Sequence, residues 1–410
     1  MPKVLTFILA GGKGERLNPL TRDRAKPAVP FGGKYRIIDF TLSNCVNSNL
    51  RRIYVLIQYK SFSLQKHILA GWDIVSTQLG EFIDVIPAQQ RISSDWYLGT
   101  ADAIYQNSYT IMDHQPDMVL ILAGDHVYKM DYQKMIDFHQ EMQADMTLVC
   151  SPQPVASAPH FGVLEVDKKN RIHGFQEKPT DPKTIPGDPG RIFASMGIYL
   201  FQKDVLLSQL EEDSRLPSQH DFGKNIIPQM LKKKKKVYVY NFTDKTGQPA
   251  YWRDIGTRDS YYEAHMDLVK PLPPIDLYDR KWPVRTFHEP FPPVRMESVQ
   301  DASGKVIEPL VRDSLVADGC IIRGAEVIQS VLSSHIEVDP HAGVANSILM
   351  EGVTVGGHAR IRNAIIDKEV HIPPHAQIGF DLETDRKRFD VTTSGIVIVA
   401  KKTAVGFPKG

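Results

Sequence analysis

The residues most capable of chemistry stand near the start of the chain, where an apolar run at 4–9 gives way to a glycine-rich stretch. That stretch combines three glycines with two cations: Gly11, Gly12, Lys13, Gly14 and Arg16. Glycine allows the backbone to turn tightly and to approach a ligand closely, and the exposed amides of such a turn form an anion-binding concavity. Because neighbouring cations add charge, the stretch predicts a polyphosphate site.

Two well-known phosphate loops do not match this stretch. A dinucleotide fold would need a third glycine where Leu17 stands and an acidic residue about twenty positions further on, but the sequence that follows is largely basic. A Walker loop would need Gly-Lys-Ser/Thr, which does not follow here.

Two carboxylates far apart in the sequence are candidate metal ligands. Asp125 directly follows the apolar run 118–124, which predicts a buried strand, and Asp254 lies in the segment 251–257. The end of such a strand is where open α/β folds bind ligands, and Mg²⁺ prefers one or two carboxylates plus phosphate oxygens. Asp125 could equally cap a helix, and the two acids could be unrelated surface residues.

Two further segments could contact a substrate. The loop 95–102 carries Trp96 and Tyr97 just before a predicted helix start, so it could hold a base or a sugar ring, although both aromatics could instead be core residues. Lys178 follows Glu177 at the end of a predicted strand and precedes a proline. It could bind a phosphate monoester, or the two residues could form an exposed ion pair.

The elements that must position these residues alternate between strand and helix. Strands are predicted at 53–58, 118–124 and 146–150, and helices at 61–70, 100–112 and 133–143. This order predicts an α/β fold with a parallel sheet and crossover helices. The chain then becomes strand-rich, and we expect mixed topology over the following segments: 162–166, 172–176, 194–201 and 237–242.

The last third of the chain differs in character. Prolines cluster at 270–294, where neither helix nor central strand is expected. Apolar residues then recur every six positions, beginning with Val316, Ile322 and Ile328. A six-residue period is typical of a parallel β-helix with one inward residue per side. We therefore expect three parts: 1–269, a linker at 270–300, and a β-helix domain at 301–410.

Composition limits the cellular context. A net charge of +1 gives no reason to expect nucleic acid or an anionic membrane as a partner. The three cysteines have no metal-binding spacing and suit a reducing compartment. The first residues lead straight into a strand, so we expect no signal peptide, and no apolar stretch is long enough to span a bilayer. We expect a soluble cytoplasmic protein.

These motifs together resemble the glucose-1-phosphate adenylyltransferases (ADP-glucose pyrophosphorylases), most closely those of bacterial glycogen synthesis. The resemblance covers nearly the whole chain. It is carried, in order, by 11–17, 24–40, 42–45, 87–91, 96–97, 99–102, 124–126, 251–257 and 278–280.

The resemblance implies a Rossmann-like nucleotidyltransferase domain followed by a left-handed parallel β-helix of hexapeptide repeats that serves oligomerisation and regulation. It implies that ATP and glucose 1-phosphate give ADP-glucose and pyrophosphate with Mg²⁺ as cofactor, for glycogen or starch-like glucan synthesis. The implied partners are these substrates, small anionic effectors and, in a homotetramer, further copies of the chain.

The resemblance also assigns roles to individual residues. The triphosphate would be bound by the amides of Gly11, Gly12 and Gly14, and neutralised by Arg16 and Lys26. The metal would be held by Asp125, a catalytic residue like Arg16 and Lys26, and by Asp254. The residues expected around glucose 1-phosphate are Tyr97, Gly162, Glu177, Lys178 and Ser195. Those expected near the nucleoside are Gln58, Gly99 and Thr100.

The sequence departs from the relatives activated by fructose bisphosphate at two positions. Asp23 replaces their lysine and Pro30 replaces their histidine. The cations associated there with effector phosphates are kept as Arg24, Arg36 and Lys368.

Two alternative functions are a sugar nucleotidyltransferase that makes UDP- or dTDP-sugars, and a non-catalytic regulatory subunit.

Overall fold

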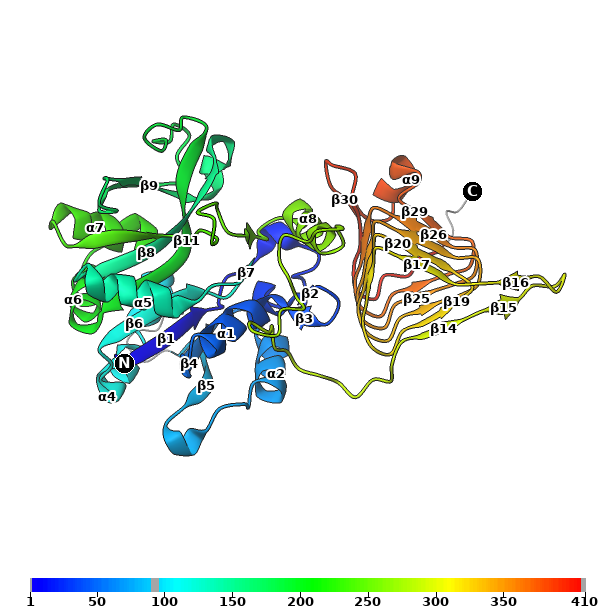
Figure 1. The fold of residues 1–410 in the computed structure, drawn as a ribbon, viewed down its shortest axis with the longest axis horizontal. Coiled ribbons are helices and arrows are strands. Elements are labelled where there is room, and N and C mark those ends of the chain that lie inside the picture. The colour runs from blue at the N-terminus through cyan, green and yellow to red at the C-terminus, as the bar shows by residue number, and fades with distance from the viewer. Residues whose placement is uncertain (1, 90–95, 407–410) are drawn as a thin grey trace. The chain divides into compact units, whose positions relative to one another are not determined.

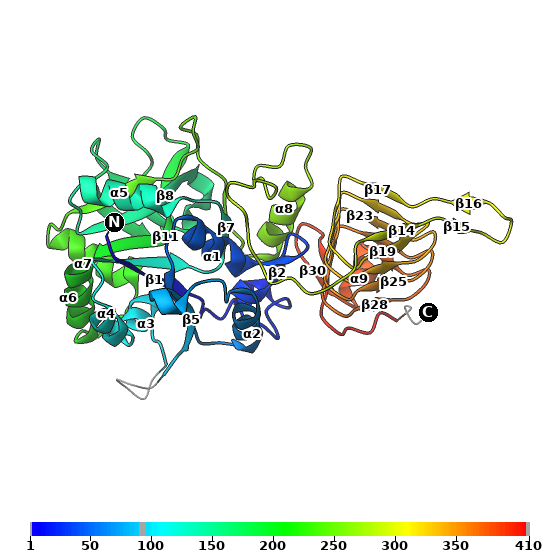
Figure 2. The same cartoon turned by 60° about the horizontal axis from the view of Figure 1, so that its bottom comes forward.

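The computed structural model describes residues 2–89 and 96–406, so Gln90, Arg91 and Asp95 of the motifs above lie outside the described residues. The chain forms two compact units. Unit 1 comprises Met1–Gly12, Phe40–Ser61 and Trp72–Trp252. Unit 2 comprises Lys13–Asp39, Phe62–Gly71 and Arg253–Gly410. Figure 1 and Figure 2 show the elements of both units in two views.

Unit 1 is built on a nine-stranded mixed sheet. Its main path is β10-β9-β11-β6-β1-β4-β5, while β8 pairs with β11 and β12 pairs with β8. The parallel part consists of β1 (Val4–Leu9), β4 (Arg52–Ile57), β5 (Phe82–Pro87) and β6 (Met118–Ala123). The later strands are β8 (Met146–Pro154), β9 (Gly162–Val166), β10 (Ile172–Glu177), β11 (Arg191–Gln202) and β12 (Val237–Asn241). Because β11 runs antiparallel to both β6 and β8, the expected mixed topology is confirmed.

Helices complete the α/β fold, which the sequence predicted correctly. They are α1 (Ile37–Asn47), α3 (Thr100–Tyr105), α4 (Ser108–His114), α5 (Tyr132–Glu141), α6 (Lys203–Ser214) and α7 (Ile227–Lys232). The single helix expected at 100–112 is wrong, because the chain breaks between α3 and α4. Asn107 explains the break: its side chain donates to the carbonyl of Ala103, 2.8 Å away, and so competes with the backbone ladder.

The core of unit 1 lies along the sheet. Strand β6 is buried on both faces up to its last residue, as a continuous apolar strand covered by helices should be. Its residues Val119 and Ile121 pack with Phe7 of β1 and with Ile104 and Leu206 from the helices. This packing holds the ends of the central strands in fixed positions.

Unit 2 contains the β-helix, whose strands form three parallel stacks. The first is β14 (Arg295–Glu297), β19 (Ile321–Arg323), β22 (Glu337–Val338), β25 (Thr354–Val355) and β28 (His371–Ile372). The second is β17 (Leu310–Arg312), β20 (Glu326–Ile328), β23 (Gly343–Ala345), β26 (Arg360–Arg362) and β29 (Gln377–Ile378). The third is β18 (Leu315–Val316), β21 (Val331–Leu332), β24 (Ile348–Leu349), β27 (Ala364–Ile366), β31 (Val397–Val399) and the antiparallel β30 (Asp390–Val391).

The stacks confirm the expected β-helix and are consistent with the left-handed form. Inward residues align on successive coils, for example Ile322 opposite Val338, and Val338 opposite Val355. One predicted inward residue was wrong. Val327 is fully buried, whereas its neighbour Ile328 is only partly buried, so the six-residue count slips by one in this strand.

The rest of unit 2 contains a short hairpin of β2 (Pro30–Phe31) and β3 (Tyr35–Arg36). It also contains the helices α2 (Phe62–Gly71) and α8 (Arg258–Leu268). Residues 269–294 carry neither helix nor strand. Thr286 in this segment donates to Oδ2 of the buried Asp39, 2.6 Å away. In both views the hairpin of β15 (Val299–Gln300) and β16 (Val306–Ile307) extends away from the coils. In the chain, α9 (Leu382–Arg386) lies between β29 and β30.

Within the described part of the chain, no helix is both long enough and apolar enough to cross a bilayer.

The buried His265 in α8 should make stability depend on pH. Its Nδ1 donates to the carbonyl of Tyr261 and its Nε2 accepts from the amide of Gly32, an arrangement that only the neutral ring can make. Burial lowers the pKa of His265 from 6.5 to about 4. The unfolded chain therefore takes up a proton first as the pH falls.

We expect this residue to cost stability as the pH falls from about 6.5 towards 4, by about 3 kcal/mol in total. Urea unfolding at pH 7 and pH 4.5 should show a smaller pH dependence for His265→Gln than for the wild type. The exposed His173→Gln serves as the control. An unchanged pH dependence in His265→Gln would contradict the assignment.

Candidate active site

Three parallel strands of unit 1 end at one edge of the sheet. Leu9 of β1 lies opposite Leu56 of β4 and Ala123 of β6. The amide of Gly124 donates to the carbonyl of Leu9 at 3.0 Å, which keeps the two strand ends level. The site residues that follow the three strands at this edge are Gly11, Gly12, Gln58 and Asp125.

The glycines at this edge differ in their surroundings. A Cβ at Gly11 would lie 3.2 Å from the Cβ of Gln58, so two residues expected to bind the nucleotide are neighbours. A Cβ at Gly12 would meet nothing within 4 Å. The backbone of Gly12 is therefore open to a close ligand, which a phosphate cradle requires.

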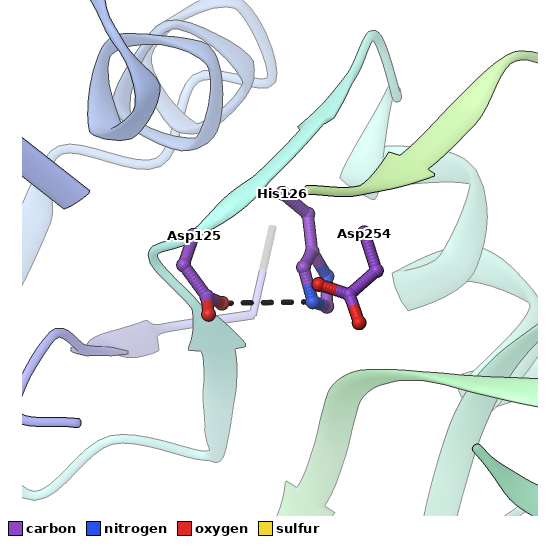
Figure 3. A group of neighbouring side chains, drawn as sticks. All are labelled: Asp125, His126 and Asp254. Atoms are coloured by element: carbon purple, nitrogen blue, oxygen red, sulfur yellow. Dashed lines mark ion pairs between the residues drawn. The ribbon is translucent and has the colours of Figure 1, made fainter. Parts of the chain in front are cut away.

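Asp125 does not cap a helix, because it is followed by β7 (His126–Tyr128). The Oδ1 of Asp125 lies 3.5 Å from Nε2 of His126, as drawn in Figure 3. The Nδ1 of His126 lies 3.4 Å from the indole Nε1 of Trp252. Since the indole can only donate, Nδ1 accepts and the ring proton sits on Nε2, facing the carboxylate. His126 was missed in the sequence, although it adjoins Asp125.

Four residues expected around the sugar phosphate come together on the outer strands of unit 1. Glu177 of β10 pairs with Gly162 of β9, and a Cβ at Gly162 would lie 3.2 Å from the Glu177 carboxylate. Nζ of Lys178 lies 3.3 Å from that carboxylate, and the lysine side chain is 55% exposed. Lys178 and Glu177 therefore form the ion pair that the sequence allowed as an alternative to phosphate binding. The exposed ammonium of Lys178 nevertheless remains accessible to an anion.

Ser195 lies beside them on β11, where Ala194 pairs with Val163 of β9. The register of β11 against β8 shifts between Ser195 and Tyr199, and Gly197 within this bulge has a φ of +66°. Burial raises the pKa of Tyr199, and a hydrogen bond from Ser195 acts in the opposite direction. The bulge therefore sets the direction of the serine side chain.

The two neighbouring aromatic residues Trp96 and Tyr97 differ in exposure. Trp96 is 56% exposed, so it is not a core residue, whereas Tyr97 packs against the core of unit 1 and its hydroxyl accepts from Asn107 at 2.9 Å. Burial raises the pKa of Tyr97.

Gly99 and Thr100 lie against the segment 219–222. A Cβ at Gly99 would lie 2.3 Å from the carbonyl oxygens of Gln219 and His220, so only glycine fits there. The Thr100 hydroxyl donates to Asp221 at 3.0 Å. Asp221 lies 121 positions away and was not identified from the sequence.

The remaining residues expected at the triphosphate belong to unit 2. Nζ of Lys26 lies 3.1 Å from Oδ1 of Asp254, with only 8% and 17% of the two side chains exposed. A Cβ at Gly256 would lie 2.9 Å from Nη2 of Arg16 and 3.2 Å from Asp254. Lys26 is thus paired with Asp254, and both Arg16 and Asp254 lie beside Gly256. Such a group can exchange its internal partners for a phosphate and a metal ion.

Gly14 shapes this cluster. Its φ of +65° favours glycine, and a Cβ there would lie 3.2 Å from the Cβ of Lys26. Its carbonyl accepts from the hydroxyl of Thr21 at 2.8 Å. The turn is therefore fixed next to the lysine.

The three candidate effector cations also belong to unit 2. Arg36 donates to the carbonyl of Ala28 and to the hydroxyl of Ser63, both at 2.9 Å. Lys368 is paired with Glu351. Burial lowers the pKa of Lys368, the charge of Glu351 opposes this shift, and the charges of Arg36 and Arg24 lower the pKa further.

Arg36 and Lys368 line one pocket of unit 2, together with Lys34, His67, Ser333 and Glu351. Arg24 is absent from the pocket lining. It is buried against Asp367 instead.

Comparison with known proteins identifies the family of each region of the chain. Residues 5–270 match the family model described as "Nucleotidyl transferase", and 292–399 match one described as "GlmU-like, C-terminal hexapeptide". The chain is therefore a nucleotidyltransferase with a hexapeptide-repeat region.

Curated relatives give a narrower result. Glucose-1-phosphate adenylyltransferase of Koribacter versatilis is 49% identical, covering 98% of this chain and 96% of its own. That of Anaeromyxobacter dehalogenans is 51% identical, covering 98% of both chains. Glucose-1-phosphate adenylyltransferase 1 of Vibrio cholerae is 51% identical, covering 99% of this chain and all of its own. The chain belongs to the glucose-1-phosphate adenylyltransferase family.

Proposed function

We propose that this protein transfers AMP from ATP to α-D-glucose 1-phosphate, releasing pyrophosphate and giving ADP-glucose for glycogen or a similar glucan, in the cytoplasm. The observation that carries the proposal is identity of about half the residues with adenylyltransferases along nearly the entire chain. Retention of Arg16 and Lys26 supports a catalytic chain over a regulatory subunit, because both cations would act on the triphosphate.

The chemistry needs no covalent enzyme intermediate. An oxygen of the sugar phosphate attacks the α-phosphorus in line while pyrophosphate leaves, so positioning and charge neutralisation supply the catalysis. The amides of Gly11, Gly12 and Gly14 bind the triphosphate, while Arg16 and Lys26 neutralise its charge.

Mg²⁺ is the proposed cofactor, with Asp125 and Asp254 as its protein ligands. Carboxylate oxygens are the donors that Mg²⁺ prefers, and both aspartates offer them. When bound, the ion offsets negative charge on the phosphates. His126, with its proton on Nε2, orients the carboxylate of Asp125.

The two substrates occupy different residue groups in this proposal. Glucose 1-phosphate binds to the group on β9, β10 and β11, which supplies Gly162, Glu177, Lys178 and Ser195, with Tyr97 from the preceding loop. The exposed ammonium of Lys178 takes the phosphate. Gln58, Gly99 and Thr100 face the nucleoside.

The direct test measures pyrophosphate release from glucose 1-phosphate with ATP, UTP and dTTP in turn. The proposal expects strong preference for ATP and ADP-glucose as the product. Preference for UTP or dTTP would establish the alternative sugar nucleotide. Correctly folded protein without activity towards any of them would indicate a regulatory subunit.

Asp125→Asn should lower kcat by at least roughly 10²-fold, the scale for losing one major electrostatic stabiliser. The substitution keeps the shape of the side chain but removes the charge that holds the metal. Steady-state rates over a range of Mg²⁺ concentrations measure the effect, with the exposed Asp137→Asn on α5 as the matched control. Near-normal turnover with unchanged Mg²⁺ dependence would exclude the metal role.

Lys178→Gln should raise KM for glucose 1-phosphate much more than KM for ATP, because its ammonium binds the sugar phosphate. Initial rates with each substrate varied separately provide the measurement. Lys168→Gln, at an exposed position of the same unit, should change neither constant. Equal increases in both KM values would refute this assignment.

We further propose that the protein is a homotetramer, and light scattering can test this oligomeric state.

We also propose that Arg24, Arg36 and Lys368 bind a small anionic effector. Asp23, whose side chain is 53% exposed, places negative charge where bisphosphate-activated relatives have a lysine. Like-charge repulsion should weaken a doubly phosphorylated activator.

We therefore expect weak or no activation by fructose 1,6-bisphosphate and a retained response to AMP or inorganic phosphate. Titrations at subsaturating ATP should show a reduced response in Lys368→Gln and a normal one in the exposed control Lys305→Gln. Strong activation of the wild type by the bisphosphate would show that Asp23 is not decisive. An unchanged response in Lys368→Gln would place the site elsewhere.

A further inference from the structure

One ion pair of unit 2 is almost completely removed from water. Nη2 of Arg24 lies 2.7 Å from Oδ1 and 2.9 Å from Oδ2 of Asp367, and only 6% and 1% of the two side chains are exposed. The two residues are 343 positions apart. The pair joins the segment after the glycine-rich turn to a coil of the β-helix.

Asp367 is held rigidly from its own side. It directly follows β27, and its amide donates to the carbonyl of Val399 at 2.9 Å. Its Oδ1 also accepts from the amide of Lys368 at 2.7 Å. The carboxylate is therefore a fixed point to which Arg24 is attached.

Other ion pairs between the β-helix and the rest of unit 2 are longer and more exposed. Among the described residues, Lys34 and Asp318 are 3.9 Å apart with 34% and 55% exposed, and Arg258 and Asp390 are 3.7 Å apart with 31% and 55% exposed. Exposed pairs contribute little, whereas loss of one partner from a buried pair leaves an uncompensated charge. The position of Arg24 thus depends strongly on Asp367.

Arg24 lies two residues before Lys26, and the short segment that follows is held at both ends. The amide of Ala28 donates to the carbonyl of Ala25 at 2.9 Å, which closes the turn around Lys26. Arg36 in turn donates to the carbonyl of Ala28. Within this tight segment, Lys26 reaches Asp254 at 3.1 Å. A shift of Arg24 would therefore shift Lys26.

We propose that Asp367 is a positioning residue for the transfer reaction: through Arg24 it holds the segment 24–28 so that Lys26 meets the triphosphate. This inference rests on the proposed function, which assigns Lys26 to the triphosphate. Because only 1% of its side chain is exposed, Asp367 acts through Arg24 in this inference. Its removal releases residue 24 from its fixed point on the β-helix, so that the segment moves.

The test compares Asp367→Asn and Asp367→Glu with the wild type in the forward reaction. Displacement of a catalytic group by about 1 Å can cost up to about 10²-fold in rate. We expect Asp367→Asn to lower kcat by about 10- to 100-fold while KM for glucose 1-phosphate stays within about twofold, and Asp367→Glu to restore most of the loss. Asp313→Asn, with its side chain 48% exposed on the same β-helix, should retain normal kcat.

The double variant Arg24→Gln/Asp367→Asn keeps the inference testable if Asp367→Asn unfolds, because it leaves no unpaired buried charge. Circular dichroism verifies its fold. A loss of kcat in the folded double variant supports the inference, and a kcat within twofold of the wild type overturns it. Activity of the wild type with ATP is measured alongside, so failure of the proposed function itself is recognised separately.

Discussion

The parallel register of β4, β1 and β6 is the constraint on which the candidate site depends. Because Leu9 faces both Leu56 and Ala123, the chain leaves all three strands at one level. The glycine turn, Gln58 and Asp125 therefore all begin at that edge. A slip of one residue would exchange the two faces of a strand and disrupt the packing on both, so the same packing that stabilises the sheet also places the functional residues.

The charged side chains of the two units differ in exposure and in pairing. At the sheet edge of unit 1, the ammonium of Lys178 and the carboxylate of Asp125 remain partly exposed and accessible to ligands. In unit 2, Lys26, Asp254, Arg24 and Asp367 are mostly buried and already paired. Buried pairs add little net stability but fix geometry, since each charge must keep its partner. Unit 2 therefore supplies preorganised cations, which suits a reaction that depends on charge placement.

The sequence predicted those features that repeat or are locally encoded. The strand at 162–166 has the observed bounds, and the six-residue period led to the β-helix. The predictions failed where the local structure depends on a single side chain or on a partner far away in the sequence. Asn107 breaks a helix that its neighbours favour, and the partners Thr100–Asp221 and Arg24–Asp367 are separated by 121 and 343 positions. No local pattern reveals such pairs, because only the folded chain brings them together.

Crystals grown with Mn²⁺ in place of Mg²⁺, a non-hydrolysable ATP analogue and glucose 1-phosphate provide the most direct test of the account. Anomalous scattering locates the metal without assumptions about its ligands. We expect a peak within ordinary metal–oxygen bonding distance of carboxylate oxygens of both Asp125 and Asp254, with the analogue's phosphates on its other side. A metal bound to the nucleotide but remote from Asp125 would contradict it.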